Sequence, residues 1–171
     1  MRQLLAILAP GFLLLAPSSP AQSTDSLPLQ AIQLIEGGPG DWIGNTRDRI
    51  VTALGRPNRL ELRTLQNQDD TLSTDSIVTL HYPAATFVIY VATSVHNDLL
   101  GEVTIWGAAY LKQSPIKLGA TLRQVRAYFD DTSRSPTQHL VYSHDTPLPH
   151  RLEFWFVKNQ LVRLQWAYPI D

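Results

Sequence analysis

One short motif occurs twice in this chain, and it constrains the fold more than any other feature. The stretches "IGNTRDRIVTALGRP", residues 43–57, and "LGATLRQVRAYF", residues 118–129, both begin with an aliphatic residue, glycine, one variable residue and threonine. Apolar residues follow four and eight places after each threonine, which is the spacing of one face of a helix. The motif therefore predicts two short helices, capped by Thr46 and Thr121, that must pack against another element.

The ends of these two helices differ in their signals. Gln124 stands three residues after Thr121, so the second helix is expected to begin with a capping box. Gly55 and Pro57 follow the first helix, where a left-handed residue and a proline end helical structure. The second helix is followed by Asp130-Asp131, so its C-terminal boundary is less sharply defined by the sequence.

Segments rich in β-branched and aromatic residues follow each helix, which predicts strands. After the first helix they are residues 59–65, 77–82, 86–91 and 101–106, and after the second helix they are residues 139–143, 151–157 and 160–166. The expected fold class is therefore α+β, with two repeats of a short helix plus antiparallel β-strands and with the helices packed on one face of the sheet. The predicted units are residues 24–112 and 113–171.

The last two strands predict a hairpin whose register must separate apolar from polar side chains. A three-residue loop, Val157-Lys158-Asn159, places Phe154 opposite Val162 and Leu152 opposite Leu164. In this register the residues expected to face the helices are Leu152, Phe154, Phe156, Val162, Leu164 and Trp166. Those expected to face away are Arg151, Glu153, Trp155, Leu161, Arg163 and Gln165.

The N-terminus has the pattern of a secretory signal peptide. Met1-Arg2 leads into the apolar run "LLAILAPGFLLLA", residues 4–16, which is too short to span a bilayer, and Ser19-Pro20-Ala21 offers a small-x-small cleavage site. Residues 1–23 are thus predicted to be a signal peptide of a periplasmic or secreted protein. The alternative of a buried helix is weakened by Pro10-Gly11 within the run.

Composition narrows the classes of partner. Removal of the signal takes away one of 14 basic side chains and none of the 15 acidic ones, so the net charge falls from −1 to −2. With no basic stripe, nucleic-acid binding is not expected. The chain has no cysteine, so neither a disulfide, a thiol nucleophile nor a lipidated cysteine is expected, and no stable membrane anchor is predicted.

The repeated aliphatic-Gly-x-Thr motif, together with the terminal "LEFWFVKNQLVRLQW", resembles the SmpA/OmlA (BamE) envelope module over residues 42–106 and 116–168. Two such modules in one exported chain are similar in plan to the β-lactamase inhibitory protein (BLIP-like) family. The resemblance implies a tandem duplication whose sheet presents a concave face to a target protein.

Several residues have the types needed for catalysis or metal binding, but their spacing argues against both. Ser143-His144-Asp145 are neighbours, whereas a Ser–His–Asp relay needs side chains that converge from separate segments. His139, His144 and His150 are interpreted as solvated histidines, with a metal site left open as the alternative. Asp69-Asp70 and Asp130-Asp131 are interpreted as loop-solvating pairs. No cofactor and no catalytic residue are predicted.

Aromatic residues on the outward strand positions are better candidates for a binding surface. Strand alternation predicts that Tyr90, Trp106 and Trp155 point away from the helices, and exposed aromatic residues flanked by charge are typical of binding hot spots. A second layer covering them is the alternative. The segment at 92–101, "ATSVHNDLLG", predicts a long hairpin tip that inserts into a partner or is ordinary surface variation. The candidate partner-binding residues are Tyr90, Trp106, Trp155, Arg151, Arg163, His96 and Asp98.

These observations favour a non-catalytic, exported protein that binds another protein, acting as an inhibitor or immunity-type protein by steric occlusion. A soluble accessory protein in envelope assembly is the alternative. A small hydrolase is less favoured, because no nucleophile and base converge in the sequence pattern.

Overall fold

The computed structural model describes residues 22–23, 27–66, 74–93, 97–144 and 149–169. Its helices are α1 (Leu29–Glu36), α2 (Gly38–Trp42), α3 (Arg47–Leu54) and α4 (Leu122–Tyr128), with a 3₁₀-helix, η1 (Ala108–Leu111). Its strands are β1 (Gln22–Ser23), β2 (Arg59–Gln66), β3 (Thr74–Tyr82), β4 (Ala85–Ala92), β5 (Asn97–Ile105), β6 (His139–His144), β7 (His150–Val157) and β8 (Gln160–Ala167).

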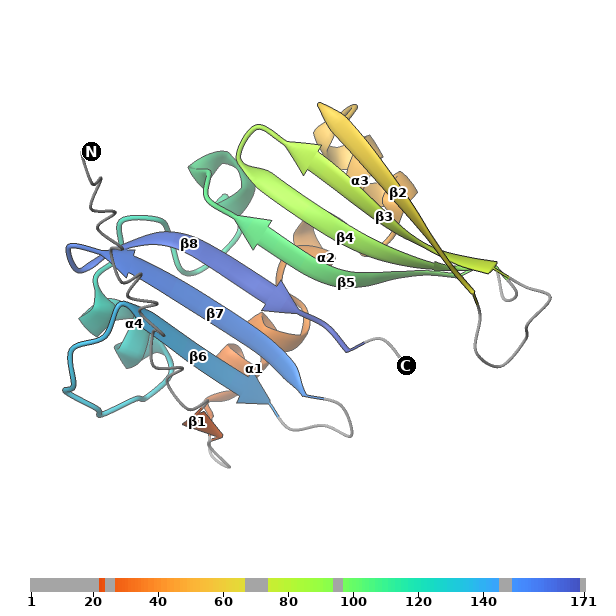
Figure 1. Ribbon diagram of the computed structural model, residues 1–171. Coiled ribbons are helices and arrows are strands. Elements are labelled where there is room, and N and C mark those ends of the chain that lie inside the picture. Colours follow the sequence, from red (N-terminus) through yellow and green to blue (C-terminus); the bar gives the residue numbers. More distant parts are fainter. Residues whose placement is uncertain (1–21, 24–26, 67–73, 94–96, 145–148, 170–171) are drawn as a thin grey trace, which may run out of the picture.

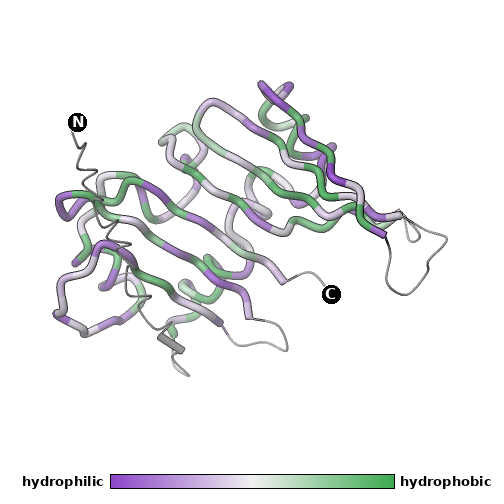
Figure 2. The backbone as a smooth tube through the Cα atoms, viewed as in Figure 1, coloured by the Kyte–Doolittle hydropathy of each residue, from purple (hydrophilic) through white to green (hydrophobic). Residues whose placement is uncertain are grey.

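The described strands form one twisted sheet in the order β1-β6-β7-β8-β5-β4-β3-β2 (Figure 1). Every neighbouring pair is antiparallel except β1 and β6, which are parallel. The four described α-helices lie behind the sheet in Figure 1, so they cover one face, and no helix of the described residues covers the other. Hydrophilic and hydrophobic residues alternate along the strands (Figure 2), as expected for a sheet with one buried face.

The prediction of two helix-plus-sheet repeats is wrong. The sheet dominates the structure, and its two groups of strands are joined through β5 and β8, where Val103 pairs with Trp166 and Ile105 with Leu164. These four side chains are fully buried in one continuous core. Pairing β5 with β8 removes two free strand edges and joins the two groups of strands in one core.

Helix α1, near the N-terminus of the described chain, packs against strands that are far away in the sequence. It packs against β6 and β7 rather than against β2 or β3. Trp166 on β8 donates its indole N–H to the carbonyl of Leu34 at 2.9 Å, and Tyr128 on α4 donates to the carbonyl of Gln30 at 3.0 Å. The sequence motif contained no signal for α1, which completes the layer under the second group of strands.

The local predictions at both threonines are confirmed. The Thr46 hydroxyl accepts a hydrogen bond from the Arg49 amide at 3.4 Å, and the Thr121 hydroxyl accepts one from the Gln124 amide at 3.3 Å. The Gln124 side chain accepts in return from the Thr121 amide at 2.8 Å, which completes the capping box. Gly55 ends α3 at φ 79°, a conformation that favours glycine.

The register of the last hairpin differs from the prediction. Lys158 and Asn159 have φ of 49° and 64°, so the hairpin closes through a two-residue turn of the I′ type and Val157 pairs with Gln160. A β-bulge between Trp155 and Phe156 then shifts the register, so that Phe154 pairs with Leu164 and Leu152 with Trp166.

The bulge explains why two side chains of β8 lie on unexpected faces. Leu161, expected to face away, is 1% exposed, whereas Val162, expected in the core, is 40% exposed. The other positions expected to face the helices, Leu152, Phe154, Phe156, Leu164 and Trp166, are all buried. An extra residue in one strand reverses the alternation on one side of the bulge only.

The predicted signal segment, residues 1–23, lies outside the described residues except for Gln22–Ser23, which form β1. None of the described helices is both long and apolar enough to cross a membrane. The predicted boundary between residues 112 and 113 falls just after η1, and no observation tests it.

Candidate functional site

The face of the sheet opposite the helices (Figure 1), here called the open face, is assigned mainly polar and aromatic side chains by the strand registers. Strand alternation and the observed registers assign them to this face, and they are half-buried or exposed. They are His139, Val141, Arg151, Glu153, Trp155, Arg163, Gln165, Glu102, Thr104, Thr86, Val88, Tyr90, Ile77, Thr79 and His81. The open face is therefore a solvated sheet surface rather than a second core.

Three of these strand positions, together with the residue that follows β5, form what we call the aromatic row: His139, Trp155, Arg163 and Trp106. Trp155 pairs with His139 on one side and with Arg163 on the other. The ladder between β5 and β8 ends at the pair Ile105 and Leu164, and Trp106 and Arg163 are the next residues of the two segments beyond that pair. Trp106 is 43% exposed. Trp155 and Arg163, which the sequence predicts on one face of the hairpin, are thus direct neighbours, and Trp106 follows the paired part of β5.

The indole of Trp155 is held between its two neighbours. The His139 ring stacks on it with centroids 4.7 Å apart and planes 19° apart, and the Arg163 guanidinium carbon lies 3.7 Å from the ring centroid. A guanidinium over an indole face is stabilised by the ring quadrupole. The ring orientation is consequently set by the fold before any partner arrives.

Charges around the row are only partly compensated. The side chain of His139 contacts the carboxylate of Glu153, with 2.8 Å between Nε2 and Oε2. Among the described side chains, Arg163 and Arg151 take part in none of the ion pairs, and the buried Nε of Arg163 has no hydrogen-bond partner. Arg163 in the row and Arg151 near it therefore offer guanidinium groups to a carboxylate or carbonyl of a partner.

Tyr90 lies on the open face but away from the row. It pairs with Leu99, whereas Trp106 lies beyond the other end of β5, about 20 Å away at the usual rise of a strand. Its hydroxyl donates to the carboxylate of Asp75, a residue that is 1% exposed, and Asp75 also accepts from the Thr93 amide at 3.0 Å. Tyr90 thus orients a buried carboxylate instead of presenting a free hydroxyl.

The remaining candidates divide between the two faces. Arg151 is exposed on the open face, four residues before Trp155 on β7. Asp98 pairs with Val91 on the helix-bearing side and accepts from the Arg47 amide at 3.2 Å, at the start of α3. His96 lies outside the described residues. The expected ten-residue tip is also wrong, because β4 and β5 continue to the pair Ala92 and Asn97.

The residues considered for catalysis do not converge. Ser143 is buried and pairs with Arg151 on the open-face side, whereas His144 points to the helix side and contacts Glu36 at 2.8 Å. Asp145, like Asp69-Asp70, lies outside the described residues. His150 stands edge-on to Tyr168, with ring centroids 5.8 Å apart. Within the described ranges there is no group of three His, Cys, Asp or Glu residues that could hold a metal.

Asp131 has a structural role that the sequence did not suggest. Its carboxylate lies 3.3 Å from the Arg126 guanidinium and accepts from the Tyr142 hydroxyl at 2.9 Å. Burial, and then the hydrogen bond to Asp131, raise the pKa of the Tyr142 phenol. Burial also raises the pKa of Tyr168, whose hydroxyl donates to the Gly37 carbonyl at 3.1 Å.

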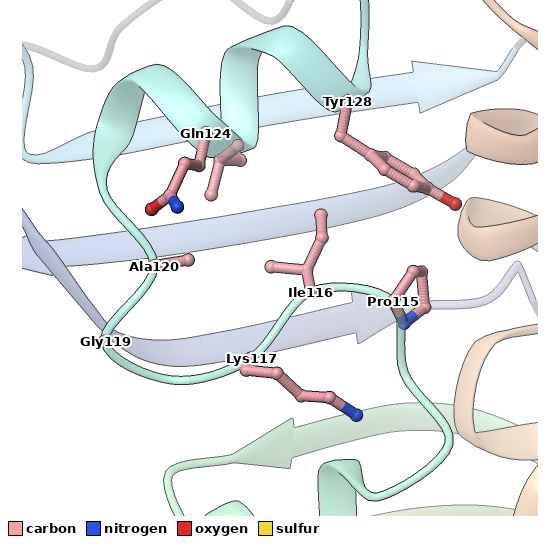
Figure 3. A pocket seen from close by; sticks show the side chains of 8 residues that line it. Pro115, Ile116, Lys117, Gly119, Ala120, Gln124 and Tyr128 are labelled. Atoms are coloured by element: carbon pink, nitrogen blue, oxygen red, sulfur yellow. The ribbon is translucent and has the colours of Figure 1, made fainter.

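The helix-bearing side has shallow grooves. One of them, of about 360 Å³, lies between α4 and the segment at 115–120. Figure 3 shows that Ile116 points toward the helix and Lys117 away from it. The Lys117 ammonium donates to the carbonyls of Leu111 and Lys112, both at 2.7 Å. The one charged side chain that lines this groove is therefore bonded to backbone carbonyls, and we assign the groove no catalytic or binding role.

Comparison of the chain with protein-family models, with curated proteins and with solved structures gave no match. The resemblance to the SmpA/OmlA module and to the BLIP-like plan therefore stays a prediction from short motifs.

Proposed function

We propose that this chain is a non-catalytic protein-binding module whose contact surface is the open face, centred on the aromatic row. The observation that carries the proposal is the line of His139, Trp155 and Arg163 across β6, β7 and β8, with Trp106 directly after the end of β5. Tryptophan and arginine are the residue types that dominate binding energy at protein interfaces.

The form of this surface favours a protein partner over a small molecule. The row lies on a broad sheet face, whereas the grooves described above lie on the helix-bearing side. Trp155 is already stacked between His139 and Arg163, so little side-chain entropy would be lost on binding. A rigid surface of this kind suits an inhibitor or immunity-type protein that acts by covering its target.

Export is the second part of the proposal. The predicted signal peptide at residues 1–23 supports a periplasmic or secreted location, where a stable, cysteine-free binding protein meets exported enzymes. A soluble accessory role in envelope assembly uses the same surface and differs only in the partner.

A pull-down from the native envelope extract tests the proposal, with the mature chain and its Trp155→Ala, Trp106→Ala and Leu29→Ala variants as baits. Leu29 is the matched control, because it is 71% exposed on α1 and lies outside the row. The proposal expects one stoichiometric protein that both tryptophan variants lose and the leucine variant keeps. A soluble enzyme as that protein supports inhibition, and outer-membrane assembly components support the accessory role. Equal capture by all four baits would contradict the proposed surface.

A further inference from the structure

Strand β2 is the edge of the sheet at the end opposite β1, and it is unusually exposed. Among the described strands it pairs only with β3. Seven of its eight residues are exposed, and Leu65 is half-buried. An edge strand has a row of backbone N–H and C=O groups without partners in its own sheet, which can pair with another strand.

The apolar side of β2 lacks the cover that its neighbour has. Leu60 pairs with Leu80 and Leu62 with Val78, so both leucines belong to the helix-bearing face. Leu80 and Val78 are 0% and 2% exposed, whereas Leu60 and Leu62 are 53% and 64% exposed. The helical layer therefore ends under β3, and two leucines extend beyond it.

We propose that β2 pairs antiparallel with β2 of a second copy of this chain. The two-fold axis passes between Leu62 of one copy and Leu62 of the other. The two sheets then form one continuous sheet, and Leu62 of each copy lies against Leu62 of the other on the helix-bearing face. A two-fold interface brings the same patch of each copy together, so the pattern of β2 must be complementary to itself. This inference does not depend on the proposed function of the open face.

The charges of β2 select the register. Arg59, Glu61 and Arg63 alternate with the leucines and share the open face. With the axis at Leu62, each Glu61 lies opposite Arg63 of the second copy, which gives two opposite-charge pairs. An axis at Glu61 would oppose two glutamates and also Arg59 with Arg63, and an axis at Arg63 would oppose two arginines. Only the axis at Leu62 avoids a like-charge pair among these three registers.

The contacts within one chain hold Glu61 in place for this pairing. One of its carboxylate oxygens lies 2.8 Å from the Arg59 guanidinium and 2.8 Å from His81 Nε2, and both partners are on the same face. The carboxylate is thus positioned beside the free edge, where Arg63 of the second copy would join the cluster.

Sedimentation equilibrium of the mature chain tests the proposal, with Leu62→Glu, Glu61→Arg, Arg63→Glu and the double swap Glu61→Arg/Arg63→Glu. Leu62→Glu should raise the dimer dissociation constant by about tenfold or more, since it opposes two carboxylates at the axis. Each single reversal should weaken the dimer, and the double swap should restore it, because opposite charges face each other again. Leu29→Glu on α1 and Arg123→Glu on α4 are controls at exposed positions and should leave the dimer unchanged.

Far-UV circular dichroism and thermal melts establish that each variant is folded, which is expected because β2 is exposed. Hydrogen exchange gives a second readout, since the β2 amides should become more protected as protein concentration rises. A chain that stays monomeric to about 1 mM would overturn the proposal. So would a dimer that survives Leu62→Glu, a double swap that fails to restore association, or capture of an unrelated extended peptide by β2 without self-association.

Discussion

The guanidinium carbon of Arg163 lies 3.7 Å above the centre of the Trp155 ring, and this contact joins β7 and β8 across the open face. The opposite face of the indole stacks on His139, so the ring is fixed from both sides. Phe154, the residue before Trp155, is 0% exposed. Its ring packs edge-on against that of Phe129, with ring centroids 5.6 Å apart. Adjacent residues of one strand thus belong to the proposed binding surface and to the core.

Trp155→Ala and Phe154→Ala should have separable effects. Phe154→Ala leaves a cavity and is expected to lower the free energy of unfolding by roughly 3–5 kcal/mol. Trp155→Ala loses mainly the cation–π contact, worth about 1 kcal/mol, but should weaken the partner complex by on the order of 2 kcal/mol or more. Thermal melts and calorimetric titration measure the two quantities. A Trp155→Ala chain as unstable as Phe154→Ala would show that the open face is structural.

The β-bulge of the last hairpin predicts a contrast on β8. Leu161 is 1% exposed, so Leu161→Ala should lower the free energy of unfolding by about 2–5 kcal/mol. Val162 is 40% exposed, and Val162→Ala should change the free energy of unfolding by about 0.5 kcal/mol or less. Urea unfolding of the two variants measures the difference. The reverse order would mean that the hairpin closes through the three-residue loop instead.

The two threonine caps are expected to differ in strength. Thr121→Ala removes a hydroxyl that makes two hydrogen bonds, one accepted from the Gln124 amide and one donated to the Gln124 side chain, whereas Thr46→Ala removes one bond of 3.4 Å. Each should lower the free energy of unfolding by about 1 kcal/mol, with the larger loss at Thr121. Thr→Ser at each position is the matched control, because serine keeps the accepting oxygen. Equal stability of the alanine and serine variants would contradict the role of the caps.

Stability should fall in alkaline solution because of the buried tyrosines. Burial and the hydrogen bond to Asp131 raise the pKa of Tyr142 above its ordinary value of 10.0. Below about pH 10 the phenol is neutral in both the folded and the unfolded chain, so its full contribution to the free energy of unfolding is retained. Above that pH the unfolded chain loses a proton that the folded chain keeps, and stability falls by up to about 1.4 kcal/mol per pH unit for this group.

Urea unfolding between pH 8 and pH 11 or so measures this fall, and Tyr142→Phe is the control. The phenylalanine variant has no phenol to titrate at this position, although it also loses the bond to Asp131 and starts from lower stability. Its stability should therefore decline less steeply with pH. Parallel profiles for both chains would show that Tyr142 does not titrate differently on unfolding.

Part of the candidate site was predictable from the sequence. The period of two in "LEFWF" placed Trp155 and Phe154 on opposite faces, and both positions are confirmed. The position of Trp106 relative to Trp155 and Arg163 was not predictable, because it depends on the pairing of β5 with β8. Asp98 was grouped with these residues by its place in a loop, yet it lies on the other side of the sheet.

Local features of this protein were determined by the sequence itself: the helices behind Thr46 and Thr121, the seven strands from β2 to β8, and the inward side of most strand residues. Each depends on residues a few positions apart, whose hydrogen bonds and alternation are encoded in the chain. The pairing of β5 with β8, the packing of α1 under β6 and β7, and the bulge that exchanges Leu161 and Val162 were decided only by the tertiary structure. They depend on which strand edges meet and on burial in a shared core, and periodicity carries no information about either.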